Sequence, residues 1–384
     1  MEDKCVLEHG LLYYKDAIPK YELTEDSMEI KIDEKIIKLH RIRALEDFGD
    51  VKKGDIGGWV ESEDNLDIFC GHSWIYDDAI VCGNAIASGY CQIRENAIIT
   101  DNVEIRDFAK ISGNVKIFDN CMIREHAEIT DNVIISGKCC ISGETEINKN
   151  VRISGNVFIH GYSSIITDNV QIMDNVEIYA CSSPGTKEKL KIEESVVLAE
   201  NCKIFGAVNI CCRAYIHGYA KIDGNAYISG DSEVYDCVKI SDDCKIKGKS
   251  KIYGRAVLKD FAKVIDASVS DKAILHDNAG AFAGANVCGT FSMFGNQWVD
   301  NGRCVSNNET QKATDWNIRN RENFRYDLVH NPEKIRKLIK DIEDRENAKK
   351  SREIDFINSM RFKDVYKRQI HRNKKAMDNI EQNV

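Results

Sequence analysis

Isoleucine recurs at every sixth position through the middle of the chain. From Ile93 to Ile165 each sixth residue is isoleucine, and a small or β-branched residue stands two places before each one. Side chains alternate along a strand, so these two positions face one side while the neighbours of each isoleucine face solvent. A spacing of six does not draw a stripe on a helix of period 3.6. The pattern therefore predicts short strands.

Each six ends in residues that suit a sharp corner. Examples are Gly113, Asp119 and Asp131, each followed by asparagine, and such residues tolerate turn conformations. Three strands and three corners make a triangular coil of eighteen residues, and stacked coils form a parallel β-helix. Inward positions from Ile75 to Met293 give 36 sixes. The fold class predicted is an all-β solenoid, a parallel β-helix of about twelve coils, with an N-terminal β cap and a C-terminal α-helical extension.

The rhythm sets the expected domain boundaries. It slips by one residue between Ile165 and Ile172 and again before Val269. An open solenoid end needs a cap, and Asn331 followed by Pro332 is typical of a helix start. The expected parts are a cap at 1–55, the β-helix at 56–293 with a loop excursion at 179–191, a second cap at 294–330, and a charged α-helical extension at 331–384.

The repeats resemble the left-handed parallel β-helix of the hexapeptide acyltransferase superfamily, in which sugar and nucleotide-sugar N- and O-acyltransferases are common. The segment LHRIRALEDFGDVKKGDIGGWVESEDNL, Leu39 to Leu66, resembles the start of YdcK-like proteins of bacteria and phages that are labelled acetyltransferases. The similarity in fold covers about Ile56 to Met293. It implies left-handed coils, a coenzyme A thioester as donor, and a homotrimer with its sites between subunits.

Two histidines are the candidate catalytic residues. His160 and His217 stand in the same tetrapeptide, Ile-His-Gly-Tyr, and each follows an inward isoleucine, so both face solvent. Enzymes of the resembling superfamily use a surface histidine as general base on an acceptor hydroxyl or amine. The two are 57 residues apart, which places them on different faces. His126 and His276 are further candidates without a distinguishing context. The alternative is that all of these are ordinary outward histidines.

The last coils lack one expected donor-binding feature. The resembling acetyltransferases commonly end in a segment of the form GxPAK that holds coenzyme A, whereas this chain has AGAFAGANVCGTFSMFG. That difference argues against acetyl-CoA as the donor. An acyl carrier protein remains a possible donor, because acyltransferases that use one carry helices after the β-helix.

Charge is divided unevenly along the chain. Its 53 basic and 62 acidic residues give a net charge of −9, which argues against general nucleic-acid or membrane binding. A C-terminal basic stretch is expected to bind an acidic partner, to pack along the chain's own acidic face, or to remain a mobile tail. Acidic residues at the corners form that face. They either serve as turn formers or imitate the phosphate backbone of a nucleic acid. The basic stretch comprises Arg361, Lys363, Lys367, Arg368, Arg372, Lys374 and Lys375, and the acidic face comprises Glu95, Asp101, Asp107, Asp119, Glu125 and Asp131.

The fifteen cysteines do not predict metal or disulfide chemistry. Five of them occupy the small inward position of the repeat, where they act as small apolar residues. There is no CxxC pair, and the adjacent pairs Cys139–Cys140 and Cys211–Cys212 are expected to face opposite sides. No apolar run is long enough to span a bilayer and the N-terminus is too polar for a signal peptide. We expect a cytoplasmic protein without a metal site. The five inward cysteines are Cys91, Cys121, Cys139, Cys202 and Cys244.

Two functions fit these observations, and we expect the first, with the second as the alternative. One is a non-catalytic β-helix scaffold that binds a macromolecular partner, including a phage-type modulator of a host system. The other is a trimeric acyltransferase that uses His160 or His217 as base. The missing donor-binding segment favours the scaffold, and the repeated histidine motif favours the enzyme.

Overall fold

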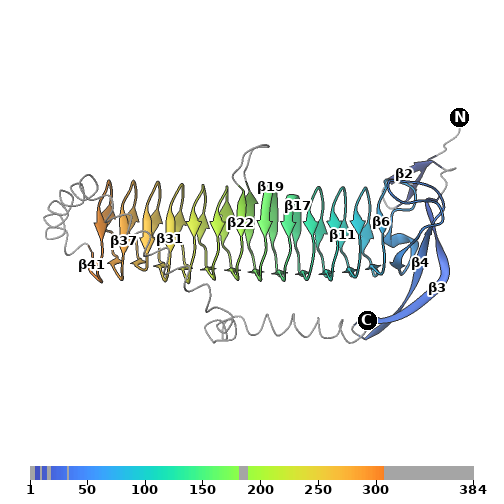
Figure 1. Ribbon diagram of the computed structural model, residues 1–384, viewed down its shortest axis with the longest axis horizontal. Helices are drawn as coiled ribbons and strands as arrows, with labels where there is room; N and C mark the ends of the chain where they lie inside the picture. Colours follow the sequence, from blue (N-terminus) through green and yellow to red (C-terminus); the bar gives the residue numbers. More distant parts are fainter. Residues whose placement is uncertain (1–4, 9–10, 15–18, 33, 181–188, 307–384) are drawn as a thin grey trace, which may run out of the picture. The chain divides into compact units, whose positions relative to one another are not determined.

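The computed structural model describes residues 5–8, 11–14, 19–32, 34–180 and 189–306. The described chain is a parallel β-solenoid of about 13 turns. It divides into a first unit that ends at Asn175 and a second that begins at Val176. The short strands within each unit stack in the order of the sequence (Figure 1). The predicted class and approximate number of coils are confirmed, and no described helix is long and apolar enough to cross a membrane.

Three columns of parallel strands form the sides of the first unit. Strands in one column are eighteen residues apart, or nineteen between β18 and β20, so each pairs with the strand one coil away. The first column is β7 (Ile80–Val81), β10 (Ile98–Ile99), β13 (Lys116–Ile117), β16 (Ile134–Ile135), β18 (Arg152–Ile153) and β20 (Gln171–Ile172). The second column begins with β8 (Ile86–Ala87), β11 (Glu104–Ile105) and β14 (Met122–Ile123). The third column begins with β6 (Trp74–Ile75), β9 (Gln92–Ile93), β12 (Lys110–Ile111) and β15 (Glu128–Ile129).

Two longer strands connect the second and third columns. β17 (Cys140–Ile147) and β19 (Phe158–Ile166) each run along one side, round a corner and into the next side. Their pairing shifts at the corner, because two residues separate Gly161 from Ser164 in β19 whereas one residue separates their partners, Gly143 and Thr145, in β17. As a result Ile166, not Ile165, is the inward residue. The first slip therefore lies before Ile166, earlier than the sequence pattern indicated.

The second unit repeats the three-column arrangement. The first column is β23 (Val197–Leu198), β26 (Tyr215–Ile216), β29 (Glu233–Val234), β32 (Lys251–Ile252), β35 (Ser268–Val269), β38 (Asn286–Val287) and β41 (Cys304–Val305). The second column is β21 (Glu177–Ala180), β24 (Lys203–Phe205), β27 (Lys221–Ile222), β30 (Lys239–Ile240), β33 (Val257–Leu258), β36 (Ile274–Leu275) and β39 (Ser292–Met293). The third column is β22 (Leu190–Ile192), β25 (Asn209–Ile210), β28 (Tyr227–Ile228), β31 (Lys245–Lys247), β34 (Lys263–Ile265), β37 (Gly280–Phe282) and β40 (Trp298–Val299).

The solenoid continues beyond its expected end. β40 and β41 pair in parallel with β37 and β38, and Val305 is buried. The boundary expected at Met293 was therefore too early, because Val299 and Val305 continue the inward positions in a segment whose composition had changed. Residues 307–384, with the rest of the expected cap, the helical extension and the basic stretch, lie outside the described residues.

The N-terminal strands extend the first column of the first unit and pack against the end of its core. β1 (Cys5–Glu8) pairs with β2 (Leu11–Tyr14), and β3 (Tyr21–Ile32) forms an antiparallel hairpin with β4 (Lys35–Ala44). β4 pairs antiparallel with β5 (Ile56–Val60), which pairs in parallel with β7 and so joins the hairpin to the first column. A 3₁₀ turn, η1 (Glu63–Asn65), follows. Against the end of the core, the buried Trp74 ring contacts Tyr21 and Phe48 edge-on.

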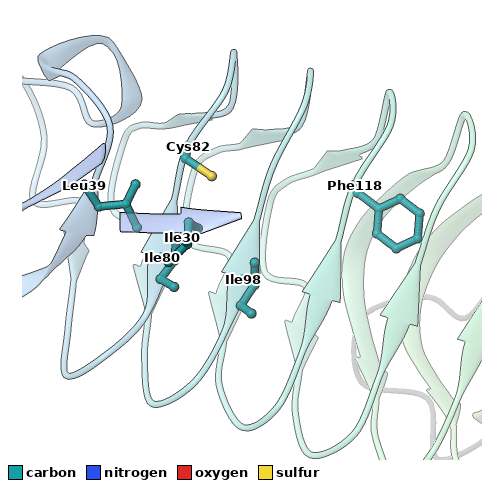
Figure 2. Close-up of a cluster of buried hydrophobic side chains, with 6 residues drawn as sticks. All are labelled: Ile30, Leu39, Ile80, Cys82, Ile98 and Phe118. Carbon is teal, nitrogen blue, oxygen red and sulfur yellow. The ribbon is translucent and has the colours of Figure 1, made fainter. Parts of the chain in front are cut away.

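The hairpin also packs on an outer face. Ile80 and Ile98 point outward from the first column, yet only 3% and 6% of their surface is exposed. Figure 2 shows Ile30 and Leu39 of the hairpin beside them. Burying these apolar side chains supports the hairpin by the hydrophobic effect. The cluster comprises Ile30, Leu39, Ile80, Cys82, Ile98 and Phe118.

Candidate functional site

His217 follows β26 in the second unit and lies between two carboxylates. Its Nδ1 is 3.7 Å from Glu200 Oε1, and its Nε2 is 3.8 Å from Glu233 Oε1. Only 19% of the imidazole is exposed, and Nε2 is buried without a hydrogen-bond partner. Both distances are longer than a hydrogen bond but short enough for strong attraction to an imidazolium. The arrangement suits a histidine that gains a proton during a reaction.

Glu233 also forms an ion pair with a lysine of the next coil. Its Oε2 lies 2.9 Å from Lys251 Nζ, one coil further on. The His217 imidazole and the Lys251 ammonium lower the pKa of Glu233 to about 2, from an ordinary value of 4.5. Glu233 is therefore ionised throughout the physiological pH range. An anion beside Nε2 favours the tautomer that carries its proton there, which leaves Nδ1 as the proton acceptor.

Aromatic rings hold the imidazole in place. Tyr215, two residues earlier, stacks on His217 with centroids 4.2 Å apart, and Tyr235 of the next coil stacks at 5.1 Å. Tyr253 continues the column at 5.2 Å from Tyr235. Rings at one position of successive coils stack because the strand spacing is about 4.8 Å. The site is thus built on strands, which fix its geometry.

His160 has a different environment, although it stands in the same tetrapeptide. It lies within β19 of the first unit, and its Nδ1 is 2.8 Å from the Oγ of the fully buried Ser142. The glycine after His160 has φ 157°, whereas the one after His217 has φ 71°. The repeated motif therefore does not produce a repeated site.

The other two histidines have simpler surroundings. His126 stacks on Phe108 with centroids 5.0 Å apart. His276 Nδ1 lies 3.2 Å from Asp277 Oδ2, and with Asp260 the two form a group that could hold a cation. However, both carboxylates already accept backbone N–H groups, from Asp277 and Gly295 at 3.0 and 2.8 Å.

The acidic face is built into the corners of the first unit. Its six residues have positive φ values between 58° and 68°. Asp101 accepts a hydrogen bond from the Asp119 N–H at 3.1 Å, and Asp107 accepts one from the Glu125 N–H at 3.1 Å. Asp101 and Asp107 therefore accept hydrogen bonds from backbone donors of the next coil. This structural role explains their position without invoking a binding partner. The residues concerned are Glu95, Asp101, Asp107, Asp119, Glu125 and Asp131.

Three expectations about residues have different outcomes. The five inward cysteines are buried as expected, and burial raises the pKa of Cys91 and Cys244 to about 12. The expectation that Cys211 and Cys212 face opposite sides is wrong, because their Sγ atoms are 3.3 Å apart. The basic stretch and residues 181–188 of the expected loop lie outside the described residues. The basic residues are Arg361, Lys363, Lys367, Arg368, Arg372, Lys374 and Lys375.

Glu200 and Glu233 were not found from the sequence. Glu233 stands at the position of Tyr215 in the next coil, and Glu200 lies seventeen positions before His217. A search for carboxylates near His217 in the chain does not reach them. Writing the sequence in rows of eighteen would have placed both beside it, which is the signal that was available.

Comparison with known proteins gives limited similarity. No family model matches the chain. It is 40% identical over 75 residues to a protein of Escherichia coli K12 described as "Uncharacterized acetyltransferase YdcK". The match covers 18% of this chain and 23% of that protein, so the chain spans less than a quarter of the length of the curated relative it matches. The expected resemblance to YdcK-like proteins is confirmed over this short region.

Proposed function

We propose that the protein is an acyltransferase in which His217 is the general base. The observation that carries the proposal is the position of His217 between Glu200 and Glu233. The proposal is also supported by the solenoid fold and by the short similarity to a protein named as an acetyltransferase. Left-handed coils and a trimer with sites between subunits, as the resemblance implies, are part of the proposal, as is a reducing, cytoplasmic location.

The proposed reaction moves one proton through His217. An acceptor hydroxyl or amine attacks the carbonyl carbon of an acyl thioester, and its proton passes to Nδ1. The bond between the carbonyl carbon and sulfur then breaks, and the proton returns to the leaving thiolate. Glu233 on the Nε2 side and Glu200 on the Nδ1 side both stabilise the transient imidazolium. General base catalysis of this kind contributes about 10²- to 10⁴-fold.

Donor binding and turnover test the proposal. The full-length protein is titrated calorimetrically with acetyl-CoA and with an acyl carrier protein, and release of the free carrier is then followed by mass spectrometry with a panel of amine and hydroxyl acceptors. We expect His217→Gln to lower turnover at least about 100-fold, Glu233→Gln to lower it less, and His126→Gln to match the parent protein. Unchanged turnover in His217→Gln would remove His217 from the mechanism, and a protein that binds neither donor is not this enzyme.

A binding scaffold is the second candidate, and an exposed aromatic column in the first unit favours it. Tyr90, Phe108 and His126 stack one above the other, with centroids 4.9 and 5.0 Å apart, and His72 meets Tyr90 edge-on at 5.1 Å. Tyr90 and Phe108 are 46% and 48% exposed. Large exposed aromatic groups are enriched where proteins bind other proteins. This candidate includes a phage-type modulator whose basic C-terminal stretch also contacts the partner.

Two variants test the scaffold candidate, and the first of them also separates it from the enzyme. Under the scaffold proposal, replacing Tyr90 and Phe108 by serine abolishes partner binding, and deleting residues 331–384 leaves a folded solenoid that binds it less tightly. Under the acyltransferase proposal, the serine variant retains turnover. Loss of turnover on changing the aromatic column, with His217→Gln unaffected, would move the active site to the first unit.

A further inference from the structure

A cluster of two thiols and one carboxylate lies at a corner of the second unit, after β25. Cys212 Sγ is 3.3 Å from Cys211 Sγ and 2.8 Å from Glu194 Oε2. The Tyr227 hydroxyl is 3.5 Å from Cys211 Sγ. The two sulfur atoms and the carboxylate oxygen all lie within 4.8 Å of one another. Three donor atoms from two successive coils thus lie close together, and the Tyr227 hydroxyl of the following coil lies beside one of them.

Backbone geometry produces this convergence. In a regular strand two adjacent side chains point to opposite faces. Cys212 instead has φ 63°, and Glu194, one coil earlier, has φ 62°. This left-handed conformation turns the Cys212 thiol back toward Cys211. A cysteine seldom adopts such a conformation. Eighteen residues later the same corner position is Gly230, which has no side chain.

We propose that Glu194, Cys211 and Cys212 form a binding site for a thiophilic divalent cation, with Zn²⁺ as the natural ion. Zinc is bound by thiolates at about 2.3 Å and by carboxylates at about 2.0 to 2.2 Å in tetrahedral sites. Two sulfur atoms and one oxygen supply three positions, and the Tyr227 hydroxyl or a water molecule supplies the fourth. Binding releases the two thiol protons.

The chemistry of the cluster fits a cation better than it fits a set of free thiols. Cys211 is buried, Cys212 and Glu194 are partly buried, and Glu193 adds a further negative charge near Cys211. Once the thiol protons are released, the two thiolates and the Glu194 carboxylate are three anionic donors, and a divalent cation between them neutralises their mutual repulsion. Because Glu194 comes from one coil and the cysteines from the next, the ion would cross-link the two coils and stabilise them against separation.

Cobalt and zinc titrations of the reduced full-length protein test the site. Co²⁺ bound by thiolates gives sulfur-to-metal charge-transfer absorption, and Zn²⁺ affinity is measured by competition with a chromophoric chelator. We expect one equivalent of Co²⁺ to give that absorption, Zn²⁺ to abolish it, and Zn²⁺ to raise Tm. Absence of charge-transfer absorption in the parent protein would overturn the proposal.

Matched variants locate the ion. Cys211→Ser and Cys212→Ser should each abolish the absorption, and Glu194→Gln should weaken Zn²⁺ binding at least tenfold while leaving the fold intact. The exposed Cys237 is the control, so Cys237→Ser should bind as the parent does. The Sγ atoms of Cys288 and Cys304 are 3.8 Å apart and form a competing thiol pair. Absorption lost in Cys288→Ser but retained in Cys212→Ser would overturn the proposal, as would full affinity in Glu194→Gln.

Discussion

The carboxylate of Asp119 accepts a hydrogen bond from the backbone N–H of Gly137, at the same corner of the next coil, over 2.8 Å. Asp119 has φ 68°, a conformation that aspartate and asparagine tolerate better than most residues. One residue therefore forms the corner and also satisfies a donor of the coil that follows. The same bond recurs in the second unit, where the backbone N–H of Gly254 donates to the carboxylate of Asp236 over 3.0 Å.

Replacing Asp119 separates these two roles. Asp119→Asn keeps an acceptor oxygen and a tolerated backbone conformation, so we expect a loss of unfolding free energy below about 0.5 kcal/mol. Asp119→Ala loses an exposed acceptor, worth about 0.5 to 1.5 kcal/mol, and also places alanine at a positive φ that aspartate tolerates better, so we expect a total cost of at least about 1 kcal/mol. Urea unfolding of both variants measures the difference. Equal losses would mean that water replaces the carboxylate without cost.

A pair of glycine variants tests the close stacking of corners. Gly113 has φ 88°, and a Cβ there would lie 2.6 Å from the Asp131 backbone nitrogen; Gly54 has φ 93° with no atom within 4 Å of a Cβ. Both alanine variants suffer the left-handed conformation, about 1 to 2 kcal/mol. We expect Gly113→Ala to cost clearly more than Gly54→Ala in urea unfolding, because only Gly113 meets the next coil.

If Gly113→Ala and Gly54→Ala unfold at the same urea concentration, the corner has room to relax. Stacking at the corners would then contribute little to the choice of glycine, and backbone conformation alone would account for it. Far-ultraviolet circular dichroism of each variant before unfolding confirms that both start from the folded state.

Lys20 makes stability depend on pH in a direction that can be measured. Its Nζ is buried and donates to the Cys70 carbonyl and Ser73 Oγ, both at 3.1 Å. Burial lowers the pKa of Lys20 to about 8, from 10.5. The unfolded chain therefore binds the proton more tightly, and below pH 8 this costs about 3 kcal/mol. As pH rises from 8 to 10.5 the cost disappears, so the Lys20 contribution to stability rises.

A Lys20→Met variant isolates this contribution. Buried thiols with raised pKa values, such as Cys91, act in the opposite direction as pH passes 9, so the useful quantity is the difference between variant and parent. We expect Lys20→Met to gain relative stability at pH 7 and to lose that gain by pH 10.5. A difference that is the same at both pH values would mean that Lys20 is solvated in the folded protein.

The repeat made the solenoid predictable, whereas contacts between coils were harder to predict. Every inward isoleucine from Ile93 to Ile159 is buried, because a period of six constrains the side that each residue faces. The extra residue before Ser164 was placed too late, since both Ile165 and Ile166 are apolar and only pairing with β17 decides between them. The hairpin over Ile80 and Ile98 was not predicted, although two outward isoleucines at one position of successive coils indicate a covered face.

The candidate sites depended on conformations that alternation along a strand does not describe. Glu233 approaches His217 across the coil spacing, and Cys212 approaches Cys211 because its backbone is left-handed. A local rule about alternating side chains fails at a corner. The position of a residue within its coil is the more informative coordinate.

The triangular coil gives the chain a reading frame of eighteen residues. Inserting eighteen residues would add one coil and leave each later side chain on its own face. Inserting six would still bury the aliphatic residues, yet it would move every later outward side chain to the next face and separate Glu200 from His217. One extra residue before Ser164 and one missing residue before Val269 are each absorbed within a single coil. Glu177 and Lys203 are 26 residues apart and still pair, so the frame is preserved there as well.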